Sequence, residues 1–544
     1  MPNYILARRS REFEFANGIE KTTDPSILEN YLTDESGVVV GHASQVVFPK
    51  TEGEISRILK EANANDTRVT VSGAGTGITG SRAPLGGIVL STEKMTHLDG
   101  GIYMEGLARQ RYGSLSYTIC IKQDQSANKH YAIAPPGIPL EIFKSIVESK
   151  QLDYPSDPTE LTALLGGSVA TDASGGRTFI YGATRNYIRR LRIVLANGDV
   201  LEVERGKVFA NEAGEFVVIL TSGERVTIQL PEYKMPQVSK NAAGFCVKPE
   251  MDLIDLFIGS EGTLGVISEI ETRLLDKPGI IVPIFAHFSM EGDAIDFSKR
   301  LRVEAKAGNL RILSIEFFDK NSVAFIRKKY PPPRIPAHSQ GIIFFEQEIP
   351  SGKELDILDE TIVLLERFNV LDTMASVGAD RQNLSKEIRH ALPEQVNLFV
   401  RLRGTHKVAT DIAVPQEAFD KMMESYHRVG DENDIPYVIF GHIGDNHLHF
   451  NFLPRNQKEL RKALNACTAL LRKAVELGGT ISGEHGVGKK TYSENGEKKP
   501  YLELMYGRKG LLSIARIKNS LDPNHILNIG NMIPFEYLEC AGTS

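Results

Sequence analysis

The spacing of hydrophobic and polar residues changes along the chain, and each change predicts a different element. VVFP after Gln45 predicts a short strand, residues 51–63 repeat apolar side chains at helical spacing, and RVTVSG from Arg68 predicts a second strand. This order predicts a β-α-β unit. The pattern farther along predicts strands at 88–91, 188–195, 279–288 and 310–319, a hairpin-rich insert at 201–230, and helices near 25–32 and at 355–367 and 419–429.

A polar hairpin is the most informative segment. Apolar residues lead into GHIGDNHLHFN at residues 441–451, and the turn formers GDN in its centre predict two antiparallel strands. If the return strand is extended, His447, His449 and Asn451 lie on one face of it. His442 ends the outgoing strand and is then close to the same face.

Glu484 and His485 lie in a second polar segment, SGEHGVG, whose glycines let both side chains enter a cleft. Two imidazoles and one carboxylate form an open site for a divalent metal, and a remaining histidine can act as a base. A single histidine is more commonly a hydrogen-bonded structural residue. Three histidines within the short range 442–449 weaken that reading.

A glycine-rich loop follows the second strand. Gly75, Gly77 and Gly80 form G-x-G-x-x-G, which is typical of a Rossmann dinucleotide site when a helix follows. Here the breaker-rich residues 81–87 lead into another strand, which argues against a Rossmann loop. The N–H groups of such a loop can instead converge on an anion such as a pyrophosphate. An ordinary surface loop is the alternative.

Length and composition limit the class of protein. The 544 residues exceed one core, so two or three domains are expected. The formal net charge of −6 gives no reason to expect nucleic acid. The four cysteines form no C-x-x-C pair, which argues against an iron–sulfur cluster or zinc finger and suits a reducing compartment.

The N-terminal segment MPNYILARRSREFEF lacks the apolar core of a signal peptide, and the chain contains no apolar run of about 18 residues. We therefore expect a cytoplasmic protein whose membrane contact, if any, is peripheral and at the inner face.

Several segments together resemble one known family. The similar motifs, in chain order, are SGAGTGITG, LLGGSVATDASGG with YGATRNYI, FIGSEGTLGVISE, GHIGDNHLH and SGEHGVG. They resemble those of the vanillyl-alcohol-oxidase (PCMH-type) FAD flavoproteins. Within that family they look most like the D-lactate, D-2-hydroxyglutarate and glycolate dehydrogenase group. The resemblance covers roughly residues 40–535.

The resemblance implies an α+β fold in three parts. These are a PCMH-type FAD-binding domain of two subdomains at 1–277, a substrate or cap domain built on an antiparallel sheet at 278–480, and a C-terminal segment at 481–544 that returns to the FAD domain.

The resemblance also implies which residues bind FAD. The first glycine loop is expected to hold the pyrophosphate and the second tract the isoalloxazine and ribityl groups, with later residues near the adenine end or kept from the C-terminal motif. The residues implied are Gly73, Gly75, Thr76, Gly77, Thr79, Gly80, Pro136, Gly137, Asp157, Gly167, Ser168, Thr171, Ser174, Gly175, Gly262, Val266 and Asn528. No loop histidine suits a covalent flavin bond, so the FAD is expected to be non-covalent.

For the metal, the family supplies two histidines and a glutamate, which fall on His442, His449 and Glu484. Zinc is favoured by analogy, while manganese and ferrous iron also fit this donor set. The chain departs from the family pattern at His447, where the related motif has asparagine. This histidine could add a ligand, replace one, or contact the substrate.

The implied activity is oxidation of a D-2-hydroxy acid to the 2-oxo acid, with hydride transfer to flavin. His485 is expected to act as the base, while Arg389, Lys407 and Asn451 are expected to contact the substrate. D-lactate is placed first. D-2-hydroxyglutarate and a glycolate oxidase-like subunit are the alternatives.

Two other classes of function stay open from the sequence. One is a flavin-fold subunit that relays electrons without catalysis, and the other is a carbohydrate oxidase, which seldom needs this cluster of histidine and glutamate. The chain has neither an iron–sulfur motif nor an NAD fingerprint. The expected electron acceptor is therefore a quinone, a cytochrome or an electron-transfer flavoprotein. A homodimer is also compatible with the sequence.

Overall fold

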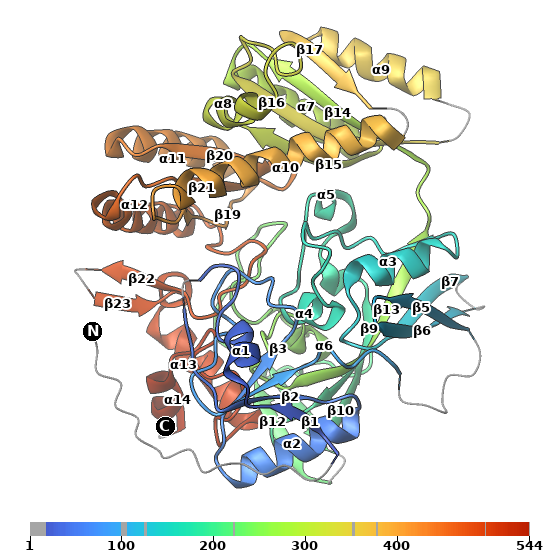
Figure 1. The fold of residues 1–544 in the computed structure, drawn as a ribbon, viewed down its shortest axis with the longest axis vertical. Helices are drawn as coiled ribbons and strands as arrows, with labels where there is room; N and C mark the ends of the chain where they lie inside the picture. The colour runs from blue at the N-terminus through green and yellow to red at the C-terminus, as the bar shows by residue number, and fades with distance from the viewer. Residues whose placement is uncertain are drawn as a thin grey trace.

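The computed structural model describes residues 18–37, 39–98, 106–124, 128–220, 223–350, 354–376, 379–494 and 497–542. The segment MPNYILARRSREFEF, on which the signal-peptide prediction depends, lies outside these residues. Within them, the strands form three larger sheets and two separate hairpins. Figure 1 shows the largest sheet in the upper part of the molecule and the other two in the lower part.

The first sheet contains the predicted β-α-β unit. Strands β2 and β3 both run parallel to β4, which lies between them, and β1 adds an antiparallel edge. The connecting helix α2 begins where the side chain of Thr51 accepts a hydrogen bond from the Glu54 amide. The strands are β1 (Glu20–Thr22), β2 (Gln45–Phe48), β3 (Val69–Ser72) and β4 (Ile88–Ser91).

The second sheet is antiparallel throughout, in the order β10-β9-β13-β7-β6-β5, with β8 paired to β13. The sequence predicted β9 and the insert after it, but not the ribbon β5–β7. Its strands are β5 (Leu107–Tyr112), β6 (Leu115–Asp124), β7 (Lys129–Ala134), β8 (Leu152–Asp153), β9 (Ile188–Val194), β10 (Val200–Glu204) and β13 (Val266–Asp276), and the separate hairpin is β11 (Glu215–Ile219) and β12 (Arg225–Gln229).

The third sheet is also antiparallel and has the order β17-β14-β16-β15-β20-β21-β18, with β19 paired to β21. Its strands are β14 (Ile280–Phe288), β15 (Ile312–Phe318), β16 (Gly341–Ile349), β17 (Val370–Ala375), β18 (Val408–Ala409), β19 (Ile412–Ala413), β20 (Tyr437–His442) and β21 (His447–Phe452), and the second separate hairpin is β22 (Thr491–Glu494) and β23 (Glu497–Pro500). The α+β class and the antiparallel third sheet agree with the sequence prediction.

Helices cover both faces of the third sheet (Figure 1). The helices are α1 (Pro25–Leu28), α2 (Glu52–Ala64), α3 (Leu140–Glu148), α4 (Leu165–Ala170), α5 (Thr178–Tyr181), α6 (Ile254–Phe257), α7 (Glu291–Ala307), α8 (Lys320–Lys329), α9 (Glu354–Glu366), α10 (Ala379–Arg401), α11 (Phe419–Asn433), α12 (Gln457–Glu476), α13 (Glu503–Leu521) and α14 (Phe535–Gly542), with short 3-10 turns η1 (Glu29–Tyr31), η2 (Thr184–Asn186), η3 (Gln416–Ala418) and η4 (Ile443–Asp445).

The two faces of the hairpin β20–β21 have different partners. Phe450 and Phe452 pack into the core on one face, where the ring of Phe450 stacks on that of Tyr426 in α11 at a centroid distance of 5.4 Å. Alternation sends His447 and His449 to the opposite face, as the sequence predicted. The apolar face of the hairpin therefore packs into the core, and its polar face is available to form a functional site.

The end of the chain returns to the first sheet. Leu527 forms a parallel bridge with Val69, and the amide of Val69 donates to the Ile526 carbonyl at 2.7 Å. Asn528 Oδ1 accepts a hydrogen bond from the amide of Val71 at 2.7 Å. The sequence predicted this return, whereas the division of the chain at residues 277 and 480 stays a prediction.

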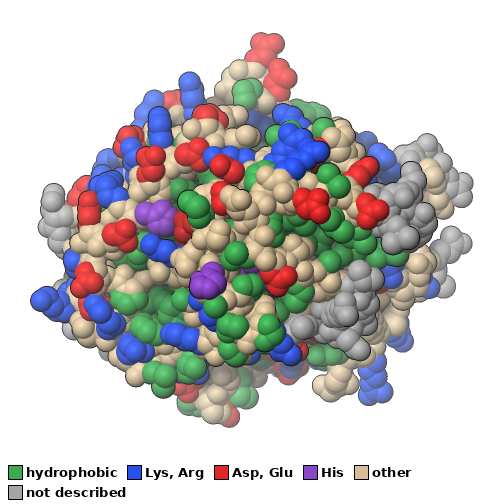
Figure 2. All heavy atoms as spheres, turned by 90° about the horizontal axis from the view of Figure 1, so that it is seen from above, with side chains coloured by type: hydrophobic (Ala, Val, Ile, Leu, Met, Phe, Trp, Pro, Cys, Tyr) green, Lys and Arg blue, Asp and Glu red, His purple; other side chains and the backbone are tan. Residues whose placement is uncertain are grey.

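The surface carries charges of both signs. Figure 2 shows Lys, Arg, Asp and Glu side chains interspersed with apolar ones over the face that lies above in Figure 1. In the part of the chain that the structure describes, no helix combines the length and the apolar character needed to cross a bilayer.

Replacing the apolar anchor of the hairpin should be costly. For Phe450→Ala we expect a loss of about 3–5 kcal/mol in the free energy of unfolding, because a fully buried aromatic ring is removed and a cavity remains. Urea denaturation followed by circular dichroism measures the loss. Leu464→Ala on α12, where the side chain is exposed, is the control and should change stability by less than about 0.5 kcal/mol. A loss below about 1 kcal/mol in Phe450→Ala would contradict this packing.

Candidate active site

A cavity of about 480 Å³ lies where the glycine-rich segments meet. Residues 73–78 and 163–174 form much of its lining, and Glu484 and His485 line it as well. The predicted cofactor residues that line it are Gly73, Gly75, Thr76, Gly77, Pro136, Gly167, Ser168, Thr171, Ser174, Gly262, Val266 and Asn528. These predicted residues, from segments far apart in the chain, thus contribute to one continuous cavity.

Five predicted cofactor residues are not part of the lining: Thr79, Gly80, Gly137, Asp157 and Gly175. The amides of Thr79 and Gly80 donate to Asp34 Oδ2 at 3.1 and 2.6 Å. These two N–H groups are therefore already hydrogen-bonded to a carboxylate of the protein. Asp157 accepts a hydrogen bond from Lys144 at 2.7 Å. Through these contacts, Thr79, Gly80 and Asp157 stabilise the loops that surround the cavity.

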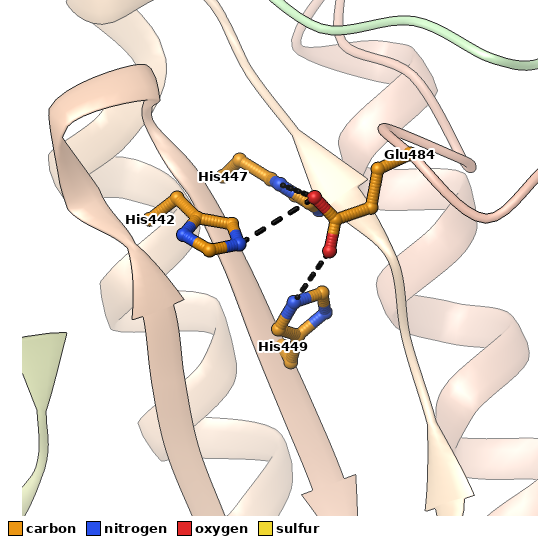
Figure 3. A group of neighbouring side chains, drawn as sticks. All are labelled: His442, His447, His449 and Glu484. Carbon is orange, nitrogen blue, oxygen red and sulfur yellow. Dashed lines mark ion pairs between the residues drawn. The ribbon is translucent and has the colours of Figure 1, made fainter. Parts of the chain in front are cut away.

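A cluster of three imidazoles and one carboxylate lies on the polar face of β20–β21 (Figure 3). His442 Nε2 is 3.4 Å and His447 Nδ1 is 3.8 Å from Glu484 Oε2, while His449 Nε2 is 3.3 Å from Glu484 Oε1. One ligand atom from each of the four residues lies within 4.8 Å of the others. The structure thus brings together the three predicted metal ligands and adds His447.

The turn of the hairpin explains how these histidines converge. Strand β20 ends at His442, the 3-10 turn η4 follows, and Asn446 adopts a left-handed conformation with φ 52° before β21 begins. The backbones of His442 and His447 are register partners across the hairpin. Because Cα atoms of paired residues are about 4.5–5.5 Å apart, the two rings necessarily lie side by side.

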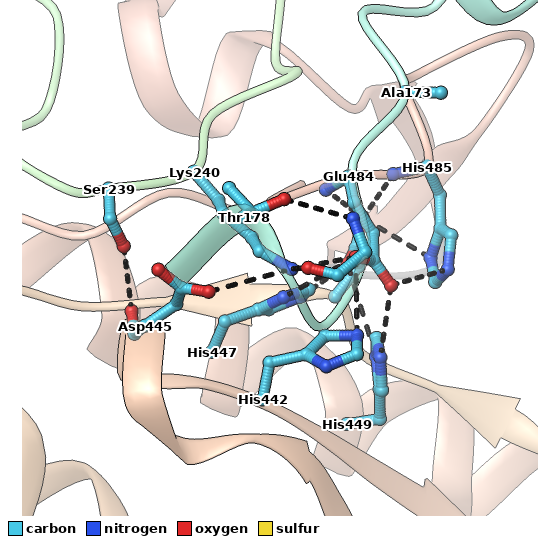
Figure 4. Close-up of polar contacts among 12 residues, drawn as sticks. Ala173, Thr178, Ser239, Lys240, His442, Asp445, His447, His449, Glu484 and His485 are labelled. Atoms are coloured by element: carbon cyan, nitrogen blue, oxygen red, sulfur yellow. Dashed lines mark hydrogen bonds and ion pairs between the residues drawn. The ribbon is translucent and has the colours of Figure 1, made fainter. Parts of the chain in front are cut away.

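Glu484 is held by a buried cation that the sequence analysis missed (Figure 4). Lys240 is fully buried, and its Nζ donates to Glu484 Oε2 at 3.0 Å and to the Gly175 carbonyl at 2.7 Å. Burial alone raises the pKa of Glu484, but Lys240 and His442 hold it well below its usual range. Glu484 is therefore a carboxylate at neutral pH. No local motif marks Lys240, since its partners lie far away in the sequence.

Asp411 is a second buried group that the sequence analysis passed over. Its Oδ2 accepts hydrogen bonds from the Ser482 hydroxyl at 2.8 Å and the His485 amide at 2.8 Å, and its Oδ1 lies 2.7 Å from His447 Nε2. Its own carbonyl accepts the Gly483 amide at 2.7 Å. Asp411 thereby fixes the backbone of the Glu484–His485 loop. It lies four residues after Lys407, in a segment that the sequence analysis had singled out for that lysine alone.

His485 joins the cluster to the cavity. Its side chain is 28% exposed and lines the cavity, with Nδ1 3.2 Å from Asp411 Oδ2 and Nε2 3.4 Å from Glu484 Oε1. Burial alone lowers the pKa of His485, but the nearby carboxylates, Asp411 first, outweigh it and raise the pKa to about 9. Without a metal, His485 is therefore protonated at neutral pH.

The other predicted substrate residues have different surroundings. Arg389 on α10 is ion-paired with Glu316, with Nε donating to Oε2 at 2.9 Å. Lys407 is half-buried just before β18, and burial lowers its pKa. It has no hydrogen bond or ion pair within the described part of the chain. Asn451 is buried on β21, two residues past His449, and its Oδ1 has no partner among the described residues.

Glu261 links the glycine loop to the segment after His485. Its carboxylate accepts the amides of Val487 and Gly488 at 2.7 and 2.8 Å and the Ser81 hydroxyl at 2.9 Å. The sequence analysis used the neighbouring Gly262 but not this residue. The carboxylate lies at the cavity wall and joins segments separated by more than two hundred residues.

Two protein-family models match the chain. The model "FAD binding domain" matches residues 43–103 and 114–204, and the model "FAD linked oxidases, C-terminal domain" matches residues 285–532. The chain carries the two domains of an FAD-linked oxidase. This confirms the predicted resemblance to FAD flavoproteins, and it makes FAD the ligand to be tested against the cavity.

Several relatives match most of the length of this chain. Glycolate oxidase subunit GlcD of Bacillus subtilis is 27% identical, and the match covers 90% of this chain and 88% of that protein. D-lactate dehydrogenase of Archaeoglobus fulgidus is 27% identical, with 90% and 91% covered. D-2-hydroxyglutarate dehydrogenase of Stutzerimonas stutzeri is 26% identical, with 94% and 95% covered.

The fold of this chain is similar to that of a solved structure. It superposes on alkyldihydroxyacetonephosphate synthase with a TM-score of 0.61 at 14% identity, covering 93% of this chain and 81% of that one. This likeness confirms the predicted fold class.

The cavity has features that fit a large polar cofactor. A Cβ built on Gly167 would have no atom within 4 Å, so the backbone there faces open space. Ser174 Oγ is buried without a hydrogen-bond partner among the described residues. A buried hydroxyl without a partner is uncommon in a folded protein, and a ligand that bonds to it removes the cost. The lining therefore suits FAD.

The protonation of His485 gives a direct test of the site without metal. In protein stripped of metal by a chelator, we expect the His485 imidazole to titrate near pH 9 by NMR, because Asp411 and Glu484 stabilise the imidazolium. Since this pKa exceeds that of an unfolded histidine, about 6.5, the interaction stabilises the folded state fully below pH 6.5 and is lost as pH rises through 9.

The stability difference between wild type and His485→Gln should accordingly shrink between pH 6.5 and pH 10. An Asp411→Asn variant should lower the pKa of His485, because the largest opposing charge is gone and burial remains. A titration of wild-type His485 near pH 6 would contradict the arrangement.

Proposed function

We propose that this chain is an FAD-dependent dehydrogenase that oxidises a D-2-hydroxy acid to the 2-oxo acid, with D-lactate as the preferred substrate. One observation carries the proposal. Glu484 and His485 line the same cavity as the glycine-rich segments, so the candidate metal cluster and the candidate base border the space that suits the cofactor.

A divalent ion fits the cluster of His442, His449 and Glu484. Their donor atoms face one another, and each imidazole has a second polar neighbour on its other nitrogen: Glu316 Oε1 at 3.5 Å from His442 Nδ1, and the Thr410 carbonyl at 3.4 Å from His449 Nδ1. Such outer contacts are typical of metal-binding histidines. When bound, a zinc, manganese or ferrous ion would supply Lewis-acid chemistry that lowers the pKa of a coordinated hydroxyl.

His485 is proposed to take the proton of the substrate hydroxyl. The side chain reaches the cavity, with Nδ1 facing Asp411 at 3.2 Å and Nε2 facing Glu484 at 3.4 Å. Nε2, on the side of the metal cluster, is the nitrogen proposed to transfer the proton. When bound, FAD would supply the hydride acceptor for C2 of the substrate. His485 must lose its own proton before it can act. The charge of a neighbouring cation would favour that loss, because it opposes the carboxylates that raise the pKa.

The surroundings of Arg389 and Lys407 support a small monocarboxylate as the substrate. Arg389 is paired with Glu316, so its charge is already balanced. Lys407 has no such partner in the described residues and is proposed to hold the substrate carboxylate. One unbalanced cation suits D-lactate better than a dicarboxylate. A relative of this chain is named D-lactate dehydrogenase.

D-2-hydroxyglutarate is the second candidate. Asn451 is buried two residues past His449, and its Oδ1 has no hydrogen-bond partner among the described residues, as expected of a group that contacts a substrate. Release of Arg389 from Glu316 would supply the charge for a second carboxylate. Another relative is named D-2-hydroxyglutarate dehydrogenase. We propose a quinone, a cytochrome or an electron-transfer flavoprotein as the acceptor of the electrons.

Substrate choice is tested by anaerobic mixing of the purified flavoprotein with D-lactate, L-lactate, D-2-hydroxyglutarate and glycolate. We expect the flavin absorbance to bleach fastest with D-lactate and not at all with L-lactate, because the base and the carboxylate-binding group fix one face of C2. Faster bleaching with D-2-hydroxyglutarate would favour the second candidate. A flavin that none of these acids bleaches would favour an electron-relay subunit, and peroxide release with sugars would favour a carbohydrate oxidase.

Loss of the base should slow the chemical step. We expect His485→Ala to reduce flavin by D-lactate roughly 10²–10⁴-fold more slowly, the usual contribution of general base catalysis, while its FAD content stays normal. Stopped-flow absorbance under anaerobic conditions measures the rate. His338→Ala, at an exposed histidine outside the cavity lining, serves as the control. A normal rate in His485→Ala would remove this residue from the proposed chemistry.

A further inference from the structure

The cluster around Glu484 contains one more imidazole than the proposed function uses. His447 Nδ1 lies 3.8 Å from Glu484 Oε2, and its donor atom belongs to the same mutually close group as those of His442 and His449 (Figure 3). The sequence left three roles open for this residue: an added ligand, a replacement ligand or a substrate contact. Its contacts decide among them.

All three imidazoles are arranged in the same way. Each presents one ring nitrogen to Glu484 and the other to an oxygen outside the cluster. For His447 this outer oxygen is Asp411 Oδ1, 2.7 Å from Nε2, the shortest of the three outer contacts. A carboxylate that accepts a hydrogen bond from the N–H of one ring nitrogen fixes the tautomer, so that the other nitrogen carries a lone pair. By this criterion His447 is at least as well prepared to bind a metal as the two predicted ligands.

One ring nitrogen of His447 also lacks a hydrogen-bond partner among the described residues. The residue is fully buried, and its Nδ1 has no hydrogen-bond partner among the described residues. A buried structural histidine normally has both nitrogens hydrogen-bonded, because an unpaired polar atom in the interior destabilises the folded state. A cation at the centre of the cluster removes that cost.

A direct role toward the substrate does not fit the surroundings of His447. The ring packs against the backbone of Gly483, where a built Cβ would lie 2.8 Å from His447 Nε2. Clamped between Gly483 and Asp411, the ring cannot turn toward the cavity.

We propose that His447 is a fourth protein ligand of the divalent metal, binding through Nδ1, and that Asp411 is the residue that orients it. The inference rests on the proposed function, since it presupposes the metal held by His442, His449 and Glu484. It also bears on the kind of ion. Four protein donors fill the positions of a tetrahedral zinc ion, so a substrate that also binds the ion requires one that accepts more than four ligands, such as manganese or ferrous iron.

Cobalt provides the test, since its visible absorption depends on the number and kind of its ligands. The full-length flavoprotein is stripped with a chelator, titrated with Co²⁺, and compared with its own metal-free form so that the flavin absorption cancels. Wild type should bind one Co²⁺ per chain. His447→Ala should bind it on the order of 10²-fold more weakly or not at all, with an altered spectrum, because one ligand is missing.

Two further variants test whether the loss in His447→Ala comes from misfolding and whether residue 447 binds the ion directly. His447→Asn keeps a polar side chain of moderate size beside Asp411 and should lose cobalt affinity to a similar degree. His447→Cys should bind cobalt with a new intense thiolate-to-metal band in the near ultraviolet, which arises only if residue 447 is bound to the ion. His485→Ala should not weaken cobalt binding, since the inference places that residue outside the ligand set.

The outcomes separate the two proposals. If wild type binds cobalt while His447→Ala and His447→Asn match it in affinity and spectrum and His447→Cys gives no thiolate band, the fourth ligand is overturned and the proposed function stands. Loss of cobalt in His485→Ala but not in His447→Ala would also overturn it, by assigning the position to His485. If wild type binds no divalent ion, both this inference and the metal site of the proposed function are contradicted.

Discussion

The geometry of the site depends on the hydrogen bonds that the buried carboxylate of Asp411 accepts. It receives hydrogen bonds from the Ser482 hydroxyl and the His485 amide on one oxygen and faces His447 with the other. A carboxylate removed from water is stable only when such donors surround it, so the loop and the hairpin are held to Asp411 and to each other. Burial alone raises its pKa, but His485 and His447 hold the pKa of Asp411 well below its usual range.

Charge around Glu484 is balanced from two directions. Lys240 lies on a segment before the third sheet and is bonded both to Glu484 and to the carbonyl of Gly175. Arg389 balances Glu316, which in turn lies 3.5 Å from His442. Each fixed cation offsets one carboxylate, and a divalent ion in the cluster would keep much of its own charge. A site of this kind favours an anionic ligand such as a carboxylate.

Local patterns were sufficient to predict much of this structure. The turn and alternation in β20–β21 placed His447, His449 and Asn451 on one face, and the adjacency of Glu484 and His485 was read directly from the chain. The breaker-rich residues 81–87 correctly separated the glycine loop from a Rossmann helix, since β4 follows. These features depend on backbone propensities that act over a few residues.

The missed residues depend on contacts that no local pattern contains. Lys240 reaches Glu484 across 244 positions, and Glu261 reaches Val487 across 226. A lone Lys or Glu in a loop is usually a solvated surface charge, so without coordinates its burial gives no signal. The ribbon β5–β7 was missed for a related reason: β5 is largely exposed and lacks a clean alternation of apolar residues.

The return of the chain to the first sheet has a consequence for biosynthesis. Asn528 bonds to the backbone of Val71 and lines the cavity, although 457 positions separate the two residues. One wall of the cavity therefore includes Val71 of the early strand β3, and the wall beside it comes from a segment translated very late. During synthesis on the ribosome, the cavity is complete only after residue 528 has emerged, so we expect tight binding of the cofactor to be a late event in the maturation of this protein.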